Sequence, residues 1–251
     1  MLKHQAKLFG FTFIVFLFLT GCKNPLDNNR EPDDMTKIAL YLDRSPGNTP
    51  SNPITLPPVK LNSQSDWEDL LAILASKGKY VNLDISPGIG MDIFNPGMFP
   101  HGADLIVSLV LPAGTSGIIG GTVFVRPFID FINLKEISGN NIETLGNYSF
   151  YGSRYLETVE FPALTIIGNN AFSYCYMMTG ITIPGSVTAI GAGAFSGCQS
   201  LTNVTFAGEI DRSKFSNSAF NGDLHAKYFG NNGGPGTYSR TRNGTVWTKH
   251  E

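Results

Sequence analysis

Hydrophobic and polar positions repeat in the second half of the chain with a period of 22–23 residues. Three segments align, over residues 142–162, 164–184 and 187–206. Each begins with an apolar–Gly step, has Phe at the fourth position after that Gly, and ends in a short run of alternating apolar and polar residues. A fixed period of this length indicates a repeat architecture.

The alternating run of each segment predicts a short β-strand whose apolar residues point inward. Burying one such side chain contributes about 1.5–3 kcal/mol, whereas ordering the backbone of one residue costs about 1–2 kcal/mol. A single unit is therefore unstable, and neighbouring units have to cover each other. We predict a solenoid with one short parallel strand per rung and about six rungs over residues 81–225; the rung boundaries between 85 and 133 stay open.

The repeat reads Ile-Gly-x-x-Ala-Phe-x-x-Cys-x-x-Leu-x-x-Val-x-Ile-Pro, which resembles the BspA-like leucine-rich repeats of bacterial surface lipoproteins. Close matches cover residues 142–206, and looser ones run from about 81 to 220. Ser149 and Ser153 replace the usual Ala and Cys, and Met178 replaces Leu. The resemblance implies a leucine-rich-repeat solenoid at a cell surface, able to bind host matrix or another bacterium.

Both ends of a solenoid need caps. Ser65 and Glu68 have the spacing of a capping box, and the apolar residues that follow predict a helix over 66–77 within an N-terminal cap at 61–80. Trp67 is the candidate to cover the first rung. Residues 226–251 are expected to form a small β cap, a hairpin with Asn243-Gly244 as a type I′ turn.

The N-terminal residues predict export. Residues 8–19 are almost wholly apolar after a basic start, and a 12-residue helix of about 18 Å is too short for a bilayer core of about 30 Å. Residues 1–21 therefore read as a signal peptide. The sequence Leu-Thr-Gly-Cys22 resembles a lipobox, which implies lipidation of Cys22 and anchoring in a bacterial envelope, with exposure at the outer membrane surface expected. The alternative is an ordinary signal peptide with an incidental Cys.

Residues 22–60 carry seven prolines and many Asn and Asp residues. Such a segment buries little apolar surface to offset its chain entropy. We predict a flexible tether, with residues 37–42 as a potential short strand.

Composition excludes several classes of function. Only 15% of residues are charged and the net charge is −2, which is not the footprint of a nucleic-acid-binding protein. The sequence has no H-E-x-x-H, C-x-x-C or calcium-loop motif. We expect no metal, no cofactor and no enzymatic activity.

Two further groups of residues are candidates for chemistry or binding. Cys175 and Cys198 share one repeat position, and a rung spacing of about 4.8 Å is compatible with a disulfide; we favour buried thiols that pack as small hydrophobes. Seven residues at variable repeat positions are of types favoured in protein interfaces, and packing between neighbouring loops is the equal alternative. They are Tyr148, Tyr151, Arg154, Tyr155, Tyr174, Tyr176 and Met177.

Three hypotheses for function follow from these features. The first is a lipid-anchored cell-surface protein that binds other proteins through its repeat surface and contributes to adhesion. The second is a periplasm-facing envelope component that binds another envelope protein. The third, an enzyme, would need a catalytic set that the sequence does not display.

Overall fold

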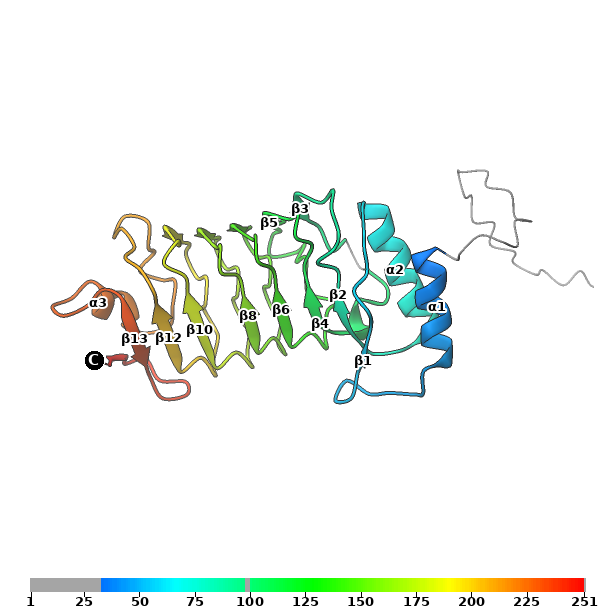
Figure 1. Cartoon of the computed structure of the whole chain (residues 1–251). Coiled ribbons are helices and arrows are strands. Elements are labelled where there is room, and N and C mark those ends of the chain that lie inside the picture. The colour runs from blue at the N-terminus through cyan, green and yellow to red at the C-terminus, as the bar shows by residue number, and fades with distance from the viewer. Residues whose placement is uncertain (1–32, 98–99, 251) are drawn as a thin grey trace, which may run out of the picture. The chain divides into compact units, whose positions relative to one another are not determined.

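The computed structural model describes residues 33–97 and 100–250. These residues form a stack of rungs with a helical cap at one end and a mixed cap at the other (Figure 1). The solenoid that the repeats predict, with one short parallel strand per rung, is confirmed. The predicted signal peptide and the lipidation site at Cys22 lie outside the described residues.

Each rung contributes a strand to a first sheet, and most contribute a shorter strand to a second sheet. The first-sheet strands are β2 (Val81–Asp84), β4 (Ile106–Val110), β6 (Glu136–Ser138), β8 (Thr158–Glu160), β10 (Gly180–Ile183) and β12 (Asn203–Phe206). The second sheet consists of β3 (Ile93–Phe94), β5 (Gly117–Ile118), β7 (Thr144–Leu145), β9 (Ile166–Ile167) and β11 (Ala189–Ile190). Partners in β6–β8 and β10–β12 are 22 and 23 residues apart, so the pairing register is the sequence period itself.

The interior contains a column of phenylalanine rings at the repeated Phe position. Phe150 stacks on Phe172 with ring centroids 5.2 Å apart, and Phe172 stacks on Phe195 at 5.3 Å. Phe128 and Phe220 extend the column at 4.5 Å from their neighbours. Each aromatic pair contributes about 0.5–1.5 kcal/mol beyond the area it buries, which couples every rung to the next.

The N-terminal cap is helix α2 (Gln64–Lys77). Its N-cap is Ser63, whose side chain accepts a hydrogen bond from the Asp66 amide, so the helix is capped two residues before the expected Ser65. Trp67 is fully buried, stacks on Phe131 at 6.4 Å, and donates its indole N–H to the Pro96 carbonyl. Trp67 thus covers the apolar end of the stack.

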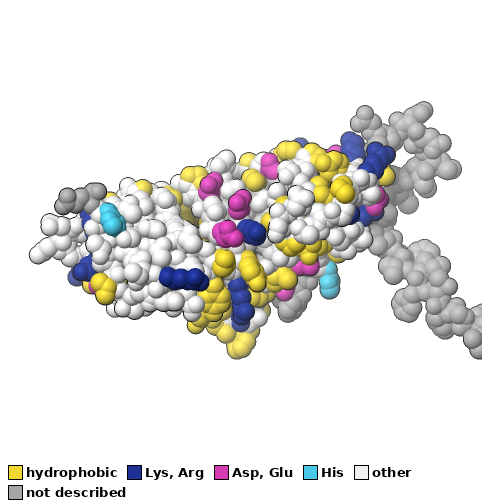
Figure 2. Space-filling view, turned by 90° about the horizontal axis from the view of Figure 1, so that it is seen from below, with side chains coloured by type: hydrophobic (Ala, Val, Ile, Leu, Met, Phe, Trp, Pro, Cys, Tyr) yellow, Lys and Arg dark blue, Asp and Glu magenta, His cyan; other side chains and the backbone are white. Residues whose placement is uncertain are grey.

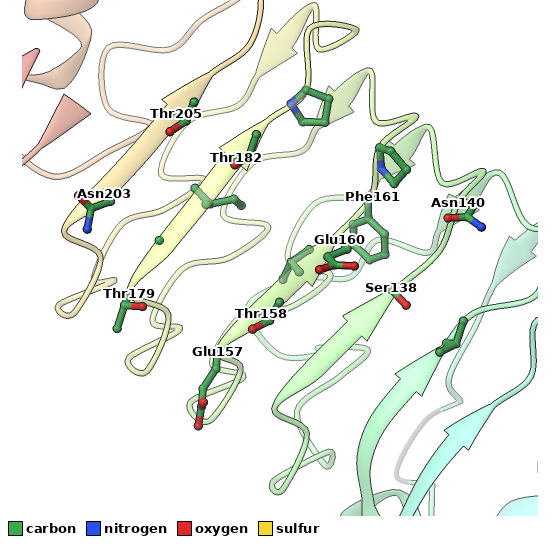
Figure 3. A pocket seen from close by; sticks show the side chains of 16 residues that line it. Ser138, Asn140, Glu157, Thr158, Glu160, Phe161, Thr179, Thr182, Asn203 and Thr205 are labelled. Carbon is green, nitrogen blue, oxygen red and sulfur yellow. The ribbon is translucent and has the colours of Figure 1, made fainter. Parts of the chain in front are cut away.

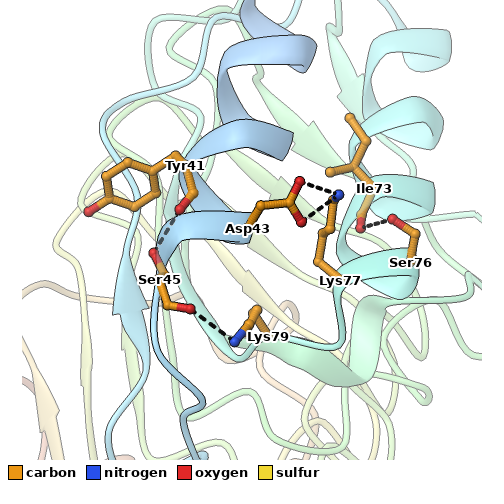
Figure 4. Close-up of polar contacts among 7 residues, drawn as sticks. All are labelled: Tyr41, Asp43, Ser45, Ile73, Ser76, Lys77 and Lys79. Atoms are coloured by element: carbon orange, nitrogen blue, oxygen red, sulfur yellow. Dashed lines mark hydrogen bonds and ion pairs between the residues drawn. The ribbon is translucent and has the colours of Figure 1, made fainter.

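The flexible tether expected over residues 22–60 is wrong for the part that the structure describes. Residues 34–44 form helix α1 (Asp34–Arg44), not a short strand, and bury Ile38 and Leu42. Strand β1 (Ile54–Thr55) then pairs in parallel with β2. Asp43 of α1 forms a 2.7 Å salt bridge with Lys77 of α2 (Figure 4). The five prolines of residues 46–58 lie outside these helices and strands, where they do not interrupt the hydrogen bonds of either.

The small C-terminal β cap that the sequence predicts is confirmed, but its turn differs from the expected one. Residues 224–228 form a short helix, α3 (Leu224–Tyr228). Strand β13 (Gly236–Ser239) pairs antiparallel with β12 on one side and with β14 (Thr248–Lys249) on the other. A type I′ turn needs positive φ at both central residues, but only Asn243 of the expected pair has it. The connection is instead the whole loop 240–247, organised by the buried Arg240 guanidinium, which donates to the Leu201, Cys198 and Gly244 carbonyls.

Candidate protein-binding surface

Consecutive loops that follow the second sheet bring the predicted tyrosines together. Tyr148 donates its amide to the Asn169 carbonyl, and Gly152 donates to Ser173, so the loop of one rung is hydrogen-bonded to the next. Tyr148 and Tyr174 both have left-handed backbone, with φ of 59° and 63°. This conformation is uncommon for residues other than glycine, and it is held here by the stacked loops.

Four tyrosine rings form a ladder across the two loops, which we call the aromatic edge. Tyr148 lies 5.5 Å from Tyr151, Tyr151 lies 5.2 Å from Tyr174, and Tyr174 lies 6.1 Å from Tyr176. The rings pack between neighbouring loops and remain partly open to solvent, so a role in binding stays a prediction. Partial burial, together with the nearby Tyr174, raises the pKa of Tyr151.

Two arginines lie over the ladder. The Arg126 guanidinium is 4.7 Å from the centre of the Tyr151 ring, and Arg154 is 5.8 Å from that of Tyr176. Cation–π contacts at exposed sites contribute about 0.5–1 kcal/mol. No carboxylate of the described residues forms a salt bridge with either arginine. The aromatic edge therefore presents two uncompensated positive charges on a polarisable surface.

These side chains enclose a shallow hollow of about 230 Å³. It is lined by Arg126, Ile129, Tyr151, Gly152, Arg154, Tyr174 and Tyr176. Of the remaining predicted residues, Tyr148 contacts Tyr151, whereas Tyr155 and Met177 are 54% and 43% exposed and lie outside the hollow. The lining offers apolar ring faces and guanidinium donors, and it contains no acidic group.

Sequence reasoning missed Arg126 and the loop before it, because this rung departs from the repeat register. Thr122 organises the loop by donating its amide to the Val125 carbonyl and accepting hydrogen bonds from two amides through its hydroxyl. At its tip Phe124 is 90% exposed, between the half-exposed Val123 and Val125. Figure 2 shows hydrophobic side chains gathered with Lys and Arg side chains on one face of the molecule. Exposed apolar clusters of this kind mark interaction sites.

The two repeat cysteines are buried, free thiols in the structure. Cys175 donates to the Phe150 carbonyl at 3.3 Å and Cys198 to the Phe172 carbonyl at 3.0 Å, each in the preceding rung. Burial raises the pKa of Cys175 well above its ordinary value. These groups act as packing residues rather than nucleophiles.

Two other features, a metal site and a membrane-spanning helix, are absent from the described residues. No three His, Cys, Asp or Glu side chains cluster there in a way that could hold a metal ion. In the same part of the chain, no helix has both the length and the apolar character required to cross a bilayer.

The short parallel strands, the fixed rung length and the aromatic interior define a leucine-rich-repeat protein. Residues 118–229 match the model for the BspA type leucine rich repeat region in six copies. This match overlaps the residues that carry the resemblance seen in the sequence.

Two solved structures are similar to the chain. A leucine-rich repeat protein from Bacteroides ovatus is 22% identical with a TM-score of 0.40, and the match covers 63% of this chain and 36% of that one. A leucine rich cell surface protein from Faecalibacterium prausnitzii is 21% identical with a TM-score of 0.24, covering 41% and 40%. The chain thus spans well under half the length of either protein. No curated protein sequence matches it.

Proposed function

We propose that this chain is a non-enzymatic, lipid-anchored protein of a bacterial cell surface that binds other proteins through its aromatic edge. The observation that carries the proposal is the pair of uncompensated arginines held over an exposed tyrosine ladder. Tyr and Arg are enriched in the energetically dominant parts of protein interfaces. Repeats of the BspA type are generally without enzymatic activity, which favours a binding role.

The charges and ring faces of the aromatic edge indicate which kind of partner it binds. Arg126 and Arg154 have free donors for a carboxylate, and a charge-assisted hydrogen bond contributes about 1.5–3 kcal/mol. The tyrosine faces and the apolar tip at Phe124 favour an aromatic or aliphatic neighbour. The partner is therefore an acidic segment with flanking apolar residues on another protein.

A peptide array tests this specificity. The full chain carrying Cys22→Ser is incubated with arrayed peptides in which Asp and Glu content varies while apolar content is constant. We expect binding to increase with acidic content and to fall about tenfold in Arg126→Gln/Arg154→Gln, a loss of about 1.4 kcal/mol. Arg212→Gln is the matched control, since Arg212 also lies over a ring, that of Phe229, at the other end of the stack. Equal losses in both proteins would contradict the assignment.

The anchor and the location are tested in cells. Cys22→Ser should convert a membrane-bound protein into a water-soluble one, because each buried methylene of an acyl chain contributes about 0.8 kcal/mol to anchoring. Protease added to intact cells should remove the wild-type protein from the cell surface. A protein that survives until the outer membrane is broken would instead support the periplasm-facing envelope component, with the binding role retained.

A further inference from the structure

The first sheet is interrupted at one place, between β8 and β10. Strands β1, β2, β4, β6 and β8 form one sheet, whereas β10 and β12 belong to another with β13 and β14. The second sheet continues past the same point, because β7, β9 and β11 pair without a break. The two rungs are therefore joined along one side of the stack and separated along the other, as the wider spacing of β8 and β10 in Figure 1 illustrates.

The backbone groups that face the gap can be identified from the bonds on either side. The Thr158 amide donates to the Lys135 carbonyl, and the Glu160 carbonyl accepts from the Gly139 amide. Lys135 and Gly139 flank β6, so Thr158 and Glu160 both face β6. Alternate residues of a strand face opposite neighbours, which turns the amide and carbonyl of Val159 toward β10. On β10, the Thr179 and Ile183 carbonyls accept from the β12 rung.

By the same alternation, Gly180 and Thr182 turn their amides and carbonyls toward β8. In the described residues, none of these facing groups on Val159, Gly180 and Thr182 has a hydrogen-bond partner. Two open strand edges therefore face each other across the gap. An open edge of this kind is a template for pairing with another chain.

The gap is the floor of a groove of about 830 Å³, within the size range of ligand sites. Val159 and Ile181 line it and are only partly buried. The corresponding residues in the closed rungs, Ile137 and Val204, are 1% and 0% exposed. Opening of the sheet thus exposes apolar floor as well as backbone, and Figure 3 shows Thr158, Thr179 and Thr182 along its sides.

The rim of the groove is acidic. Glu157 and Glu160 line it, and Glu136 lies beside Glu160 in an adjoining hollow. All three side chains are exposed, and no salt bridge among the described residues neutralises them. The groove therefore has the opposite charge to the aromatic edge and selects a different ligand.

We propose that this groove binds an extended basic segment of a protein partner by strand addition. An inserted strand needs about 9.6 Å between its two neighbours, whereas parts of β8 and β10 lie closer than 8 Å, so binding widens this seam. The segment then pairs its backbone with the open edges of β8 and β10 and places alternate apolar side chains over Val159 and Ile181. Its Lys or Arg side chains lie toward the acidic rim formed by Glu157 and Glu160. Main-chain hydrogen bonds supply affinity in this mode, and the side-chain positions supply specificity. A strand rises about 3.3 Å per residue, so β10 accommodates about four to six residues of the ligand.

Hydrogen exchange tests whether the edges are open. In the free protein the amides of Val159, Gly180 and Thr182 should exchange much faster than that of Thr205 in the closed β10–β12 pair. The probe for binding is the peptide Lys-Val-Lys-Val-Lys-Val, whose addition should slow exchange at these three amides and leave Thr205 unchanged. Slow exchange in the free protein would overturn the proposal, because it would show a continuous sheet.

Three matched comparisons separate strand addition from simple ionic attraction. The same peptide with alternate backbone nitrogens methylated keeps its charge but loses edge donors, and it should bind at least tenfold more weakly. Glu157→Gln/Glu160→Gln should weaken binding of the unmodified peptide, whereas Glu143→Gln/Glu209→Gln, which removes two exposed carboxylates elsewhere, should not. Equal affinity of the methylated and unmodified peptides would overturn the proposal in favour of non-specific adsorption.

A second copy of this chain is the competing occupant. Sedimentation of the Cys22→Ser protein at increasing concentration should show a monomer with unprotected edge amides. A concentration-dependent dimer that protects Val159, Gly180 and Thr182 would assign the groove to self-association and overturn the proposal. The arginine variants of the aromatic edge should bind the basic peptide normally, so failure of either site is distinguishable from failure of the other.

Discussion

Ser149 occupies a repeat position at which the following rungs have alanine, and its replacement by Ala should stabilise the protein. Ala171 and Ala194 hold this position in the following rungs and are fully buried. Ser149 is also fully buried, and its hydroxyl has no hydrogen-bond partner among the described residues. A hydroxyl buried without a partner costs about 1–3 kcal/mol relative to water. Because the neighbouring rungs accept Ala, the void left by the oxygen is small.

We expect Ser149→Ala to raise the free energy of unfolding by about 1 kcal/mol, which corresponds to about 2–4 °C in Tm for a domain of this size. Urea unfolding with an unchanged m-value measures the change. Ser173→Ala is the control, because the Ser173 hydroxyl is buried but donates to the Gly193 carbonyl at 2.6 Å. Its loss should cost about 1 kcal/mol. A destabilising Ser149→Ala, or shifts of the same sign in both variants, would refute the reasoning.

Cys175 should react with iodoacetamide only after unfolding, because burial raises its pKa and blocks access; rapid labelling of the native protein, read by mass spectrometry, would contradict this. Arg240→Ala should lower the free energy of unfolding by about 3 kcal/mol or more, since it leaves several buried carbonyls unpaired. A change of less than about 0.5 kcal/mol, the size typical of surface substitutions, would contradict this. Burial lowers the pKa of His225 below 6.5. The unfolded chain then binds more protons, so stability should fall as the pH drops through 6.5, and His225→Gln should flatten that slope in thermal melts across this range.

The repeat pattern specified the interior because each inward position carries a constraint that the sequence must meet in every rung. The Phe column and the parallel register follow directly from residues that recur at 22–23-residue intervals. Elements outside the period lack that redundancy. Helix α1 was not predicted, because the prolines near it in the sequence favour an irregular chain. The loop that carries Phe124 and Arg126 belongs to the rung that fits the repeat pattern least.

Most of the aromatic edge could be named in advance, because tyrosines at variable repeat positions in neighbouring rungs must lie close together. The interruption between β8 and β10 could not. Val159 and Ile181 are the residues that the repeat requires, like Ile137 and Val204 in closed rungs. The pattern specifies which side chains point inward, but it carries no information on whether two backbone edges meet.

The unbroken second sheet beside the divided first sheet also has a mechanical consequence. At every other junction between adjacent first-sheet strands from β2 to β12, hydrogen bonds on that side resist bending. At the junction between β8 and β10 the opposite side still resists bending, because β9 and β11 are paired there, so the stack has an intrinsic hinge whose axis lies between β9 and β11. In an array whose stability depends on contacts between nearest neighbours, tension applied along the stack would be accommodated at this one seam before any rung unfolds.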